Sequence, residues 1–158
     1  MDSKGTLVLG IGNTLLTDEG VGIHVINHLE QDFGEDEEVT LLDGGTLSFT
    51  LAGYLESHRR LIVVDAARIS GKPGEVACFE GDAMDRYLTG NRQSVHEVGL
   101  TDLLDIAMLQ GHYPEQRALI GIEPENLDWG EEPSPVVAEA IPKAARMAAE
   151  LIDKWDRG

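Results

Sequence analysis

Short apolar runs alternate along the chain with segments in which apolar residues recur every three or four positions. The runs are typical of strands buried on both faces of a parallel sheet, and the spaced segments are typical of helices packed on such a sheet. Strands are predicted at residues 6–11, 39–42, 60–64, 75–79 and 117–122, and helices at residues 20–29, 49–56, 98–109 and 133–155. Strand and helix therefore alternate along most of the chain.

This alternation predicts an α/β fold, namely a single-domain three-layer sandwich in which a mostly parallel, twisted sheet carries helices on both faces. The strand at 75–79 follows a turn at Lys72-Pro73-Gly74 and is expected to be an antiparallel or edge strand. Asp18 is expected to cap the first helix. Pro142 lies within the last helix and is expected to kink or divide it.

Length and composition agree with one domain that spans residues 1–158. With 42% hydrophobic residues, a chain of this size can bury a core without disulfides or a structural metal. Cys78 is the only cysteine, which excludes cysteine-rich zinc sites. The first residues form no basic leader, and no apolar stretch approaches the roughly 20 residues of a membrane span, so a cytoplasmic protein is expected.

The net charge narrows the range of partners. Twelve basic residues stand against 29 acidic ones, which gives a formal charge of −17 and a sequence pI near 4.4. Such a field repels phosphate polyanions, so nucleic acid and anionic membrane surfaces are not expected partners. A basic segment of another protein, or a metal ion, suits this charge better.

The glycine-rich loop after the first strand invites comparison with a dinucleotide-binding turn. The fingerprint G-x-G-x-x-G requires a third glycine where this chain has Leu15. Carboxylates at Asp18 and Glu19 would also repel a pyrophosphate near the start of the helix. The glycines by themselves therefore indicate a tight turn from strand to helix.

Acidic side chains follow the first and third strands, and a histidine precedes the helix predicted at 98–109. In open α/β sheets, sites form beyond the carboxyl ends of the strands. Glu19, Asp65 and His96 each have an ordinary structural explanation, as a first-turn acid, a loop cap and a surface residue. Together they offer two carboxylates and one imidazole, a set that suits a divalent transition metal such as zinc or nickel with open coordination positions.

Several separated motifs resemble those of one known family, the [NiFe]-hydrogenase maturation proteases. The longest is GIGNTLLTDEGVG at residues 10–22. DGGT at 43–46, LIVVDA at 61–66, PG at 73–74, SVHEVGL at 94–100 and LIGIEPE at 119–125 follow in the family's order. The resemblance covers essentially the whole chain, and it is the combination of motifs that makes it specific.

The resemblance implies a cytoplasmic endopeptidase, of aspartyl or metal-dependent type, that removes the C-terminal extension of a hydrogenase large-subunit precursor after nickel insertion. It also implies that Glu19, Asp65 and His96 bind the metal. The expected ion is Ni²⁺ supplied by the substrate, with Zn²⁺ or Cd²⁺ able to take its place. Asp43 matches the family's aspartate in the Asp-Gly-Gly motif and is expected to be a catalytic or substrate-recognition group, although an aspartate before two glycines is also common in turns.

Two other functions compete with this interpretation. One is a non-catalytic nickel chaperone or binding module that uses the same three ligands and binds the same precursor. The other is a nucleoside phosphorylase-like or nucleotide-binding α/β protein, which the missing glycine and the missing phosphate-binding basic residues argue against.

Overall fold

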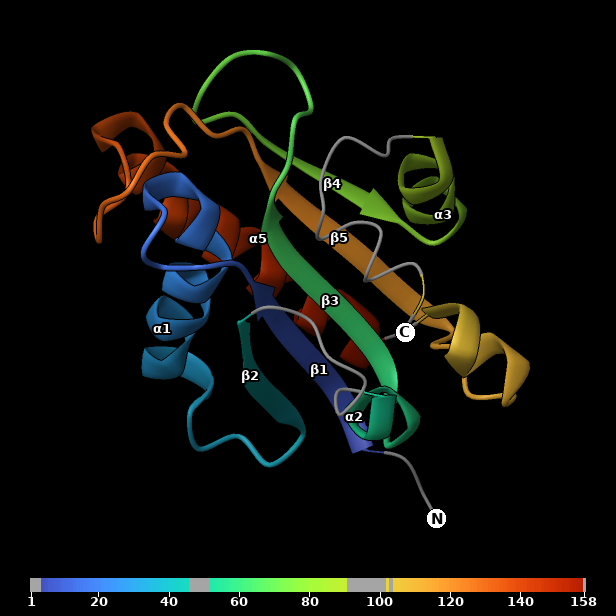
Figure 1. Ribbon diagram of the computed structural model, residues 1–158. Helices are drawn as coiled ribbons and strands as arrows, with labels where there is room; N and C mark the ends of the chain where they lie inside the picture. The colour runs from blue at the N-terminus through green and yellow to red at the C-terminus, as the bar shows by residue number, and fades with distance from the viewer. Residues whose placement is uncertain (1–3, 46–51, 91–101, 103, 158) are drawn as a thin grey trace.

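The computed structural model describes residues 4–45, 52–90, 102 and 104–157. The predicted alternation of strand and helix is present in these residues (Figure 1). In chain order the elements are β1 Lys4–Ile11, the 3₁₀ helix η1 Thr17–Gly20, α1 Val21–Phe33, β2 Val39–Gly45, α2 Ala52–Glu56, β3 His58–Ala66, β4 Val76–Glu80, α3 Asp82–Gly90, β5 Gln116–Ile122 and α5 Pro135–Arg157.

The five strands form one sheet in the order β2-β1-β3-β5-β4. The first three neighbouring pairs are parallel, and β4 joins β5 in antiparallel fashion at the edge, as its turn-bounded sequence predicts. The carboxyl ends of β1, β2, β3 and β5 therefore lie at the same edge of the sheet, which is the upper edge in Figure 1.

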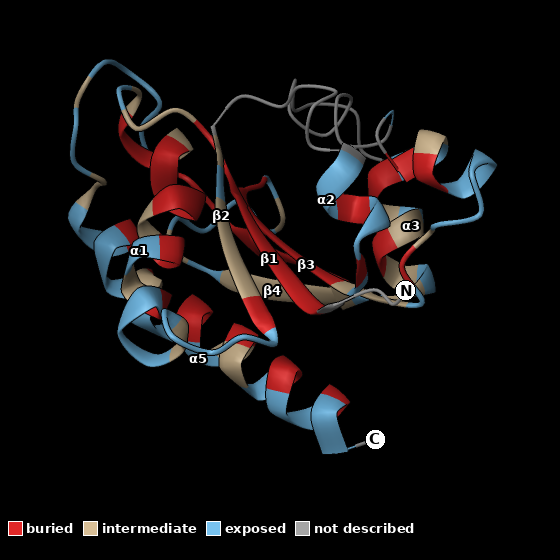
Figure 2. Ribbon diagram, turned by 90° about the horizontal axis from the view of Figure 1, so that it is seen from below, coloured by how far each residue is buried: buried red, intermediate tan, exposed pale blue. Residues whose placement is uncertain are grey.

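Helices cover both faces of the sheet, which confirms the three-layer α/β prediction (Figure 2). On one face, α1 and α5 pack together over alternate residues of β1, β3 and β5, among them Val8, Ile62 and Ile120. On the other face, α2, α3 and Leu104 cover the intervening residues, such as Leu61 and Val63. Because β1, β3 and β5 are covered on both sides, they have the nearly continuous apolar sequences from which they were predicted.

The prediction for Asp18 is wrong, and of the two effects expected of Pro142, a kink or a division of the last helix, the division is absent. Asp18 does not cap α1: Gly20 stands at the N-cap, and Asp18 lies in η1, which precedes α1. Pro142 does not divide the last helix, since α5 is continuous from Pro135 to Arg157. Pro142 is exposed, so the backbone hydrogen bond that its ring removes lies on the side of the helix that faces water.

One helix was not predicted, and parts of two predicted helices lie outside the described residues. The helix that was not predicted is α3, in which Met84 and Leu88 are the buried apolar side chains among the described residues. Residues 49–51, 98–101 and 103 are not described, whereas residues 104–109 are helical as predicted. None of the helices in the described part of the chain combines the length and apolar composition of a membrane span.

Candidate active site

Asp43 and Asp65 lie at the carboxyl edge of the sheet, on the strands that flank β1. In the β1–β2 pair Gly10 is opposite Asp43, and in the β1–β3 pair Gly10 is opposite Val64. Asp65 is thus one residue farther along its strand than Asp43. Because neighbouring strands are about 4.8 Å apart, the backbones of the two aspartates are separated by roughly 10 Å across β1.

Asp65 is a buried carboxylate at the end of an apolar strand, with only 4% of its surface exposed. Side chains alternate between the faces of a strand, so Asp65 shares the face of Leu61 and Val63, which is the face covered by α2 and α3. A carboxylate at such a depth requires hydrogen-bond donors or a cation. Asp65 was predicted as a site residue because of this position at the end of an apolar strand.

Glu19 is half-buried in η1, a 3₁₀ turn that contacts β3. The Glu19 N–H donates to the carbonyl of Leu16 at 3.0 Å. Gly12 has a φ of 141°, and a Cβ there would overlap the carbonyl oxygen of Glu19, so only glycine fits. A Cβ at Gly22 would overlap the carbonyl of Val64, the residue before Asp65. The glycine-rich motif therefore allows the start of α1 to pack against the strand that ends in Asp65.

The structure does not bring all the predicted site residues together. Asp43 is exposed and shares the strand face of Val39 and Leu41, which pack on the α1 side, whereas Asp65 lies on the opposite face. His96 lies outside the described residues. In residues 4–45, 52–90, 102 and 104–157, no group of three or more histidine, cysteine or acidic side chains could hold a metal ion. The ligand set of Glu19, Asp65 and His96 therefore stays a prediction.

Asp18 has a role that the sequence analysis did not predict. Its fully buried carboxylate accepts hydrogen bonds from the N–H groups of Glu125 and Asn126, both at 2.8 Å, and of Ser134 at 2.6 Å, as well as from the Ser134 hydroxyl at 2.8 Å. Burial alone would raise the pKa of Asp18, but these four donors outweigh it and lower the pKa below its ordinary value. Asp18 thus fastens the 3₁₀ turn that carries Glu19 to the loop at 125–134.

The buried carboxylate of Glu123 acts in a similar way on the loop after β3. Its Oε1 accepts hydrogen bonds from the N–H groups of Ile69, Ser70 and Gly71, at 2.6, 2.9 and 3.1 Å. Burial opposes ionisation, yet these donors and the charge of Arg68 lower the pKa of Glu123. Glu123 comes directly after the apolar strand β5, just as Asp65 lies at the end of β3. An acidic residue at the end of a buried strand was therefore visible in the sequence at both positions.

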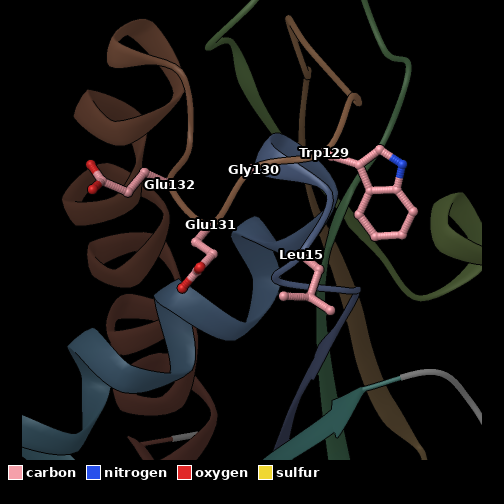
Figure 3. Close-up of a pocket in the computed structure, with 5 residues that line it drawn as sticks. All are labelled: Leu15, Trp129, Gly130, Glu131 and Glu132. Atoms are coloured by element: carbon pink, nitrogen blue, oxygen red, sulfur yellow. The ribbon is translucent and has the colours of Figure 1, made fainter.

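The loop at 125–134 also forms an open pocket beside η1 (Figure 3). Leu16 and Gly130 form an isolated parallel bridge that joins this loop to the glycine-rich motif. In this loop Trp129, Glu131 and Glu132 are exposed. The pairing of this loop with a segment more than 100 residues away in the chain could not be predicted from local pattern.

The fold and the site together define a class. A mostly parallel α/β sheet with acidic side chains at the carboxyl ends of its strands has the arrangement in which α/β proteins place their binding sites. The sequence profile of one family, described as "Hydrogenase maturation protease", matches residues 23–151. The chain belongs to the hydrogenase maturation protease family.

Individual relatives support the same assignment. The "Hydrogenase expression/formation protein HupD" of Rhizobium leguminosarum bv. viciae is 37% identical over 150 residues, which cover 94% of this chain and 74% of that protein. The "Hydrogenase 2 maturation protease" of Escherichia coli K12 is 37% identical over 124 residues, or 77% of this chain and 74% of that protein. The solved structure of the hydrogenase maturating endopeptidase HybD from E. coli has a TM-score of 0.85 and 31% identity, and the match covers 98% of this chain and 93% of that one.

Proposed function

We propose that this chain is a cytoplasmic endopeptidase that removes the C-terminal extension of a [NiFe]-hydrogenase large-subunit precursor after nickel has been inserted. The observation that supports this most directly is the placement of Asp65, a carboxylate buried at the end of β3 with the backbone of η1 and α1 packed beside it. Membership of the maturation protease family supplies the reaction class.

We further propose that Glu19, Asp65 and His96 recognise the nickel ion that the precursor carries. Two carboxylates and an imidazole are donors that divalent transition metals accept, and three protein ligands leave positions open for the groups that already hold the ion in the substrate. Zn²⁺ or Cd²⁺ would fit the same donors. Binding the substrate's metal would place the adjacent peptide bond at the carboxyl edge of the sheet, so that cleavage follows nickel insertion.

Asp43 is proposed as a catalytic or substrate-recognition group at the same edge. It is exposed and lies across β1 from Asp65, so a bound segment could contact it from solvent. A divalent ion at the site would be able to polarise the scissile carbonyl or to activate a water molecule. Replacing Asp43 by asparagine would distinguish recognition from catalysis, because loss of recognition raises KM and loss of a catalytic group lowers kcat.

The test is the intact mass of a nickel-loaded large-subunit precursor after incubation with the protein. Loss of a C-terminal peptide is expected with the unmodified protein and nickel-loaded precursor, and not with nickel-free precursor. Glu19→Gln and His96→Ala should slow the cleavage by more than about 100-fold. Replacing residues that only support metal ligands already lowers metal affinity or activity by about 10–100-fold.

Matched controls are an exposed glutamate and an exposed histidine away from this edge. The control variants are Glu37→Gln and His112→Ala. Glu37 lies in the turn before β2, and His112 follows the helical residues 104–109. Both variants should cleave like the unmodified protein. A nickel-loaded cognate precursor that is bound but not shortened would overturn the protease assignment and favour the non-catalytic nickel chaperone. Stabilisation by nucleotides would favour the nucleotide-binding alternative.

A further inference from the structure

Two large apolar side chains are exposed beside the candidate site. Trp129 is 80% exposed and Leu15 is 52% exposed, and with Gly130, Glu131 and Glu132 they line an open pocket of about 720 Å³. In Figure 3 the side chains of Leu15 and Trp129 lie on one side of the backbone at Gly130, and those of the two glutamates lie on the other side. An exposed apolar pair with a polar border is typical of a surface that binds another molecule.

The backbone beneath these side chains is held in place. Thr17 donates its N–H to the carbonyl of Gly130 at 2.8 Å, and Gly130 donates its N–H to the carbonyl of Leu15 at 2.9 Å. The Thr17 hydroxyl donates to the carbonyl of Asn126, and the Asp18 carboxylate joins the same two loops. A surface with its backbone already ordered loses little conformational entropy when a partner binds. The exposed indole is therefore presented by a preorganised pair of loops.

The charge of the pocket indicates what kind of partner fits it. Glu131 and Glu132 are exposed acids at its border, and the chain as a whole carries a charge of −17. A second copy of this chain would bring the same charge and be repelled. A segment that combines an aliphatic or aromatic side chain with lysine or arginine would place the apolar group against Leu15 and Trp129. Its cation would meet the glutamates or the indole face.

We propose that Leu15, Trp129, Glu131 and Glu132 form a docking surface for an apolar and basic segment of the large-subunit precursor. The proposal rests on the proposed function for the identity of the partner. Leu15 is four residues before Glu19, and the Glu19 N–H donates to the carbonyl of Leu16. A segment bound in the pocket would therefore contact the same glycine-rich turn that carries the residue proposed to meet the nickel ion. The surface would contribute affinity for the precursor and leave the chemical step unchanged.

The apolar half of the surface is tested with the double variant Leu15→Ser, Trp129→Ala. Binding of the unmodified protein and of the variant to immobilised nickel-loaded precursor is measured, together with apparent KM and the rate at saturating precursor. We expect binding to weaken and KM to rise by at least about tenfold, as loss of an aromatic anchor does at protein interfaces, with the saturated rate unchanged. Leu109→Ala is the matched control, since Leu109 is 88% exposed and outside the pocket, and it should behave like the unmodified protein.

The acidic half is tested by reversing its charge. The double variant Glu131→Lys, Glu132→Lys should weaken binding by about tenfold at low salt, and the difference should shrink as salt is added. Glu35→Lys, Glu37→Lys makes the same change of net charge in the exposed turn before β2 and should have a much smaller effect. An equal loss in both variants would show that only the overall charge matters and would overturn the docking surface.

The readouts separate this proposal from the proposed function. Binding that depends on Trp129 without shortening of the precursor would refute the protease and support the docking surface. Normal cleavage with unchanged binding and KM in the Leu15→Ser, Trp129→Ala variant would refute the docking surface and support the protease. A lower saturated rate with unchanged binding would also overturn the docking surface, because it would indicate that these residues only support Glu19.

Discussion

At the scale of single residues, two neighbouring carboxylates can differ sharply in their surroundings. Asp18 and Glu19 are neighbours, yet Asp18 is fully buried with four hydrogen-bond donors around it, whereas Glu19 is half-buried at the edge of the sheet. Asp18 holds the loop at 125–134 in place. Glu19 remains partly exposed and could therefore contact a ligand.

This difference predicts a large effect on stability at Asp18. Asp18→Asn turns an acceptor of four hydrogen bonds into a group whose amide hydrogens face N–H donors, so the free energy of unfolding should fall by about 2 kcal/mol or more. Urea unfolding measures it. Asp128→Asn is the matched control in the same loop, is exposed, and should change stability by less than about 0.5 kcal/mol. Equal effects at both positions would contradict the role assigned to Asp18.

Asp65 lies at the carboxyl edge of the sheet as predicted, whereas Asp18 was predicted to cap a helix and does not. The signal for Asp65 is local, because an acid directly after an apolar strand is visible in a few residues. The partners of Asp18 lie 107 to 116 residues away in the chain. No local pattern can show contacts of that separation, and they decided the role of Asp18.

At the scale of elements, the position of Glu19 depends on how closely α1 approaches the sheet. The junction between η1 and α1 packs against the backbone at the ends of β1 and β3, and this approach leaves no room for a side chain at Gly22. The motif that resembles a phosphate-binding turn is therefore a packing device here. Its glycines bring a helix and its preceding turn against the strand that ends in Asp65.

Gly22→Ala should consequently be far more harmful than a glycine substitution elsewhere. The added Cβ would lie 2.6 Å from the carbonyl oxygen of Ile11 and would overlap that of Val64, so the helix must shift. We expect a loss of about 2–4 kcal/mol of unfolding free energy. Gly53→Ala in α2 meets no atom within 4 Å and should be neutral or stabilising by up to about 1 kcal/mol. Thermal unfolding of both variants tests the pair, and a comparable loss at Gly53 would contradict it.

The elements that could be predicted are the ones with a strong apolar pattern. All five strands were predicted to within a few residues, because burial on one or both faces leaves a clear signal. Helix α3 was not, because it buries only Met84 and Leu88 fully, too few positions to establish a helical period. Pro142 was expected to kink or divide α5, and the helix is not divided there, with Pro142 on its exposed side.

At the scale of the whole molecule, two buried carboxylates link folding to pH. The pKa of Asp18 and that of Glu123 are lowered in the folded protein from ordinary values of 3.8 and 4.5. A group with a lowered folded pKa stabilises the protein above its unfolded pKa, and this contribution is lost as pH falls toward the folded pKa. Stability should therefore decline as the pH drops below about 4.5, and further below 3.8.

Glu123→Gln isolates one of these contributions. At pH 7 it should lower the free energy of unfolding by about 1–3 kcal/mol relative to Glu125→Gln, because three N–H donors lose their carboxylate. Glu125 has an exposed side chain, and its variant makes the same change in net charge, so general repulsion in this acidic protein cancels. Urea unfolding from pH 7 to pH 3 should show the gap narrowing below pH 4.5. A gap independent of pH would contradict the linkage.

The sequence by itself determined the α/β class, the strands and the acidic positions at their carboxyl ends. Burial and side-chain periodicity produce patterns that are visible within a few neighbouring residues. The family followed from motifs whose order survives along the chain. Tertiary structure alone decided that β4 pairs with β5, that Asp43 and Asp65 lie on opposite faces, and that the loop at 125–134 joins the glycine-rich motif. These features depend on which distant segments meet, and a local pattern of apolar and polar residues does not encode that choice.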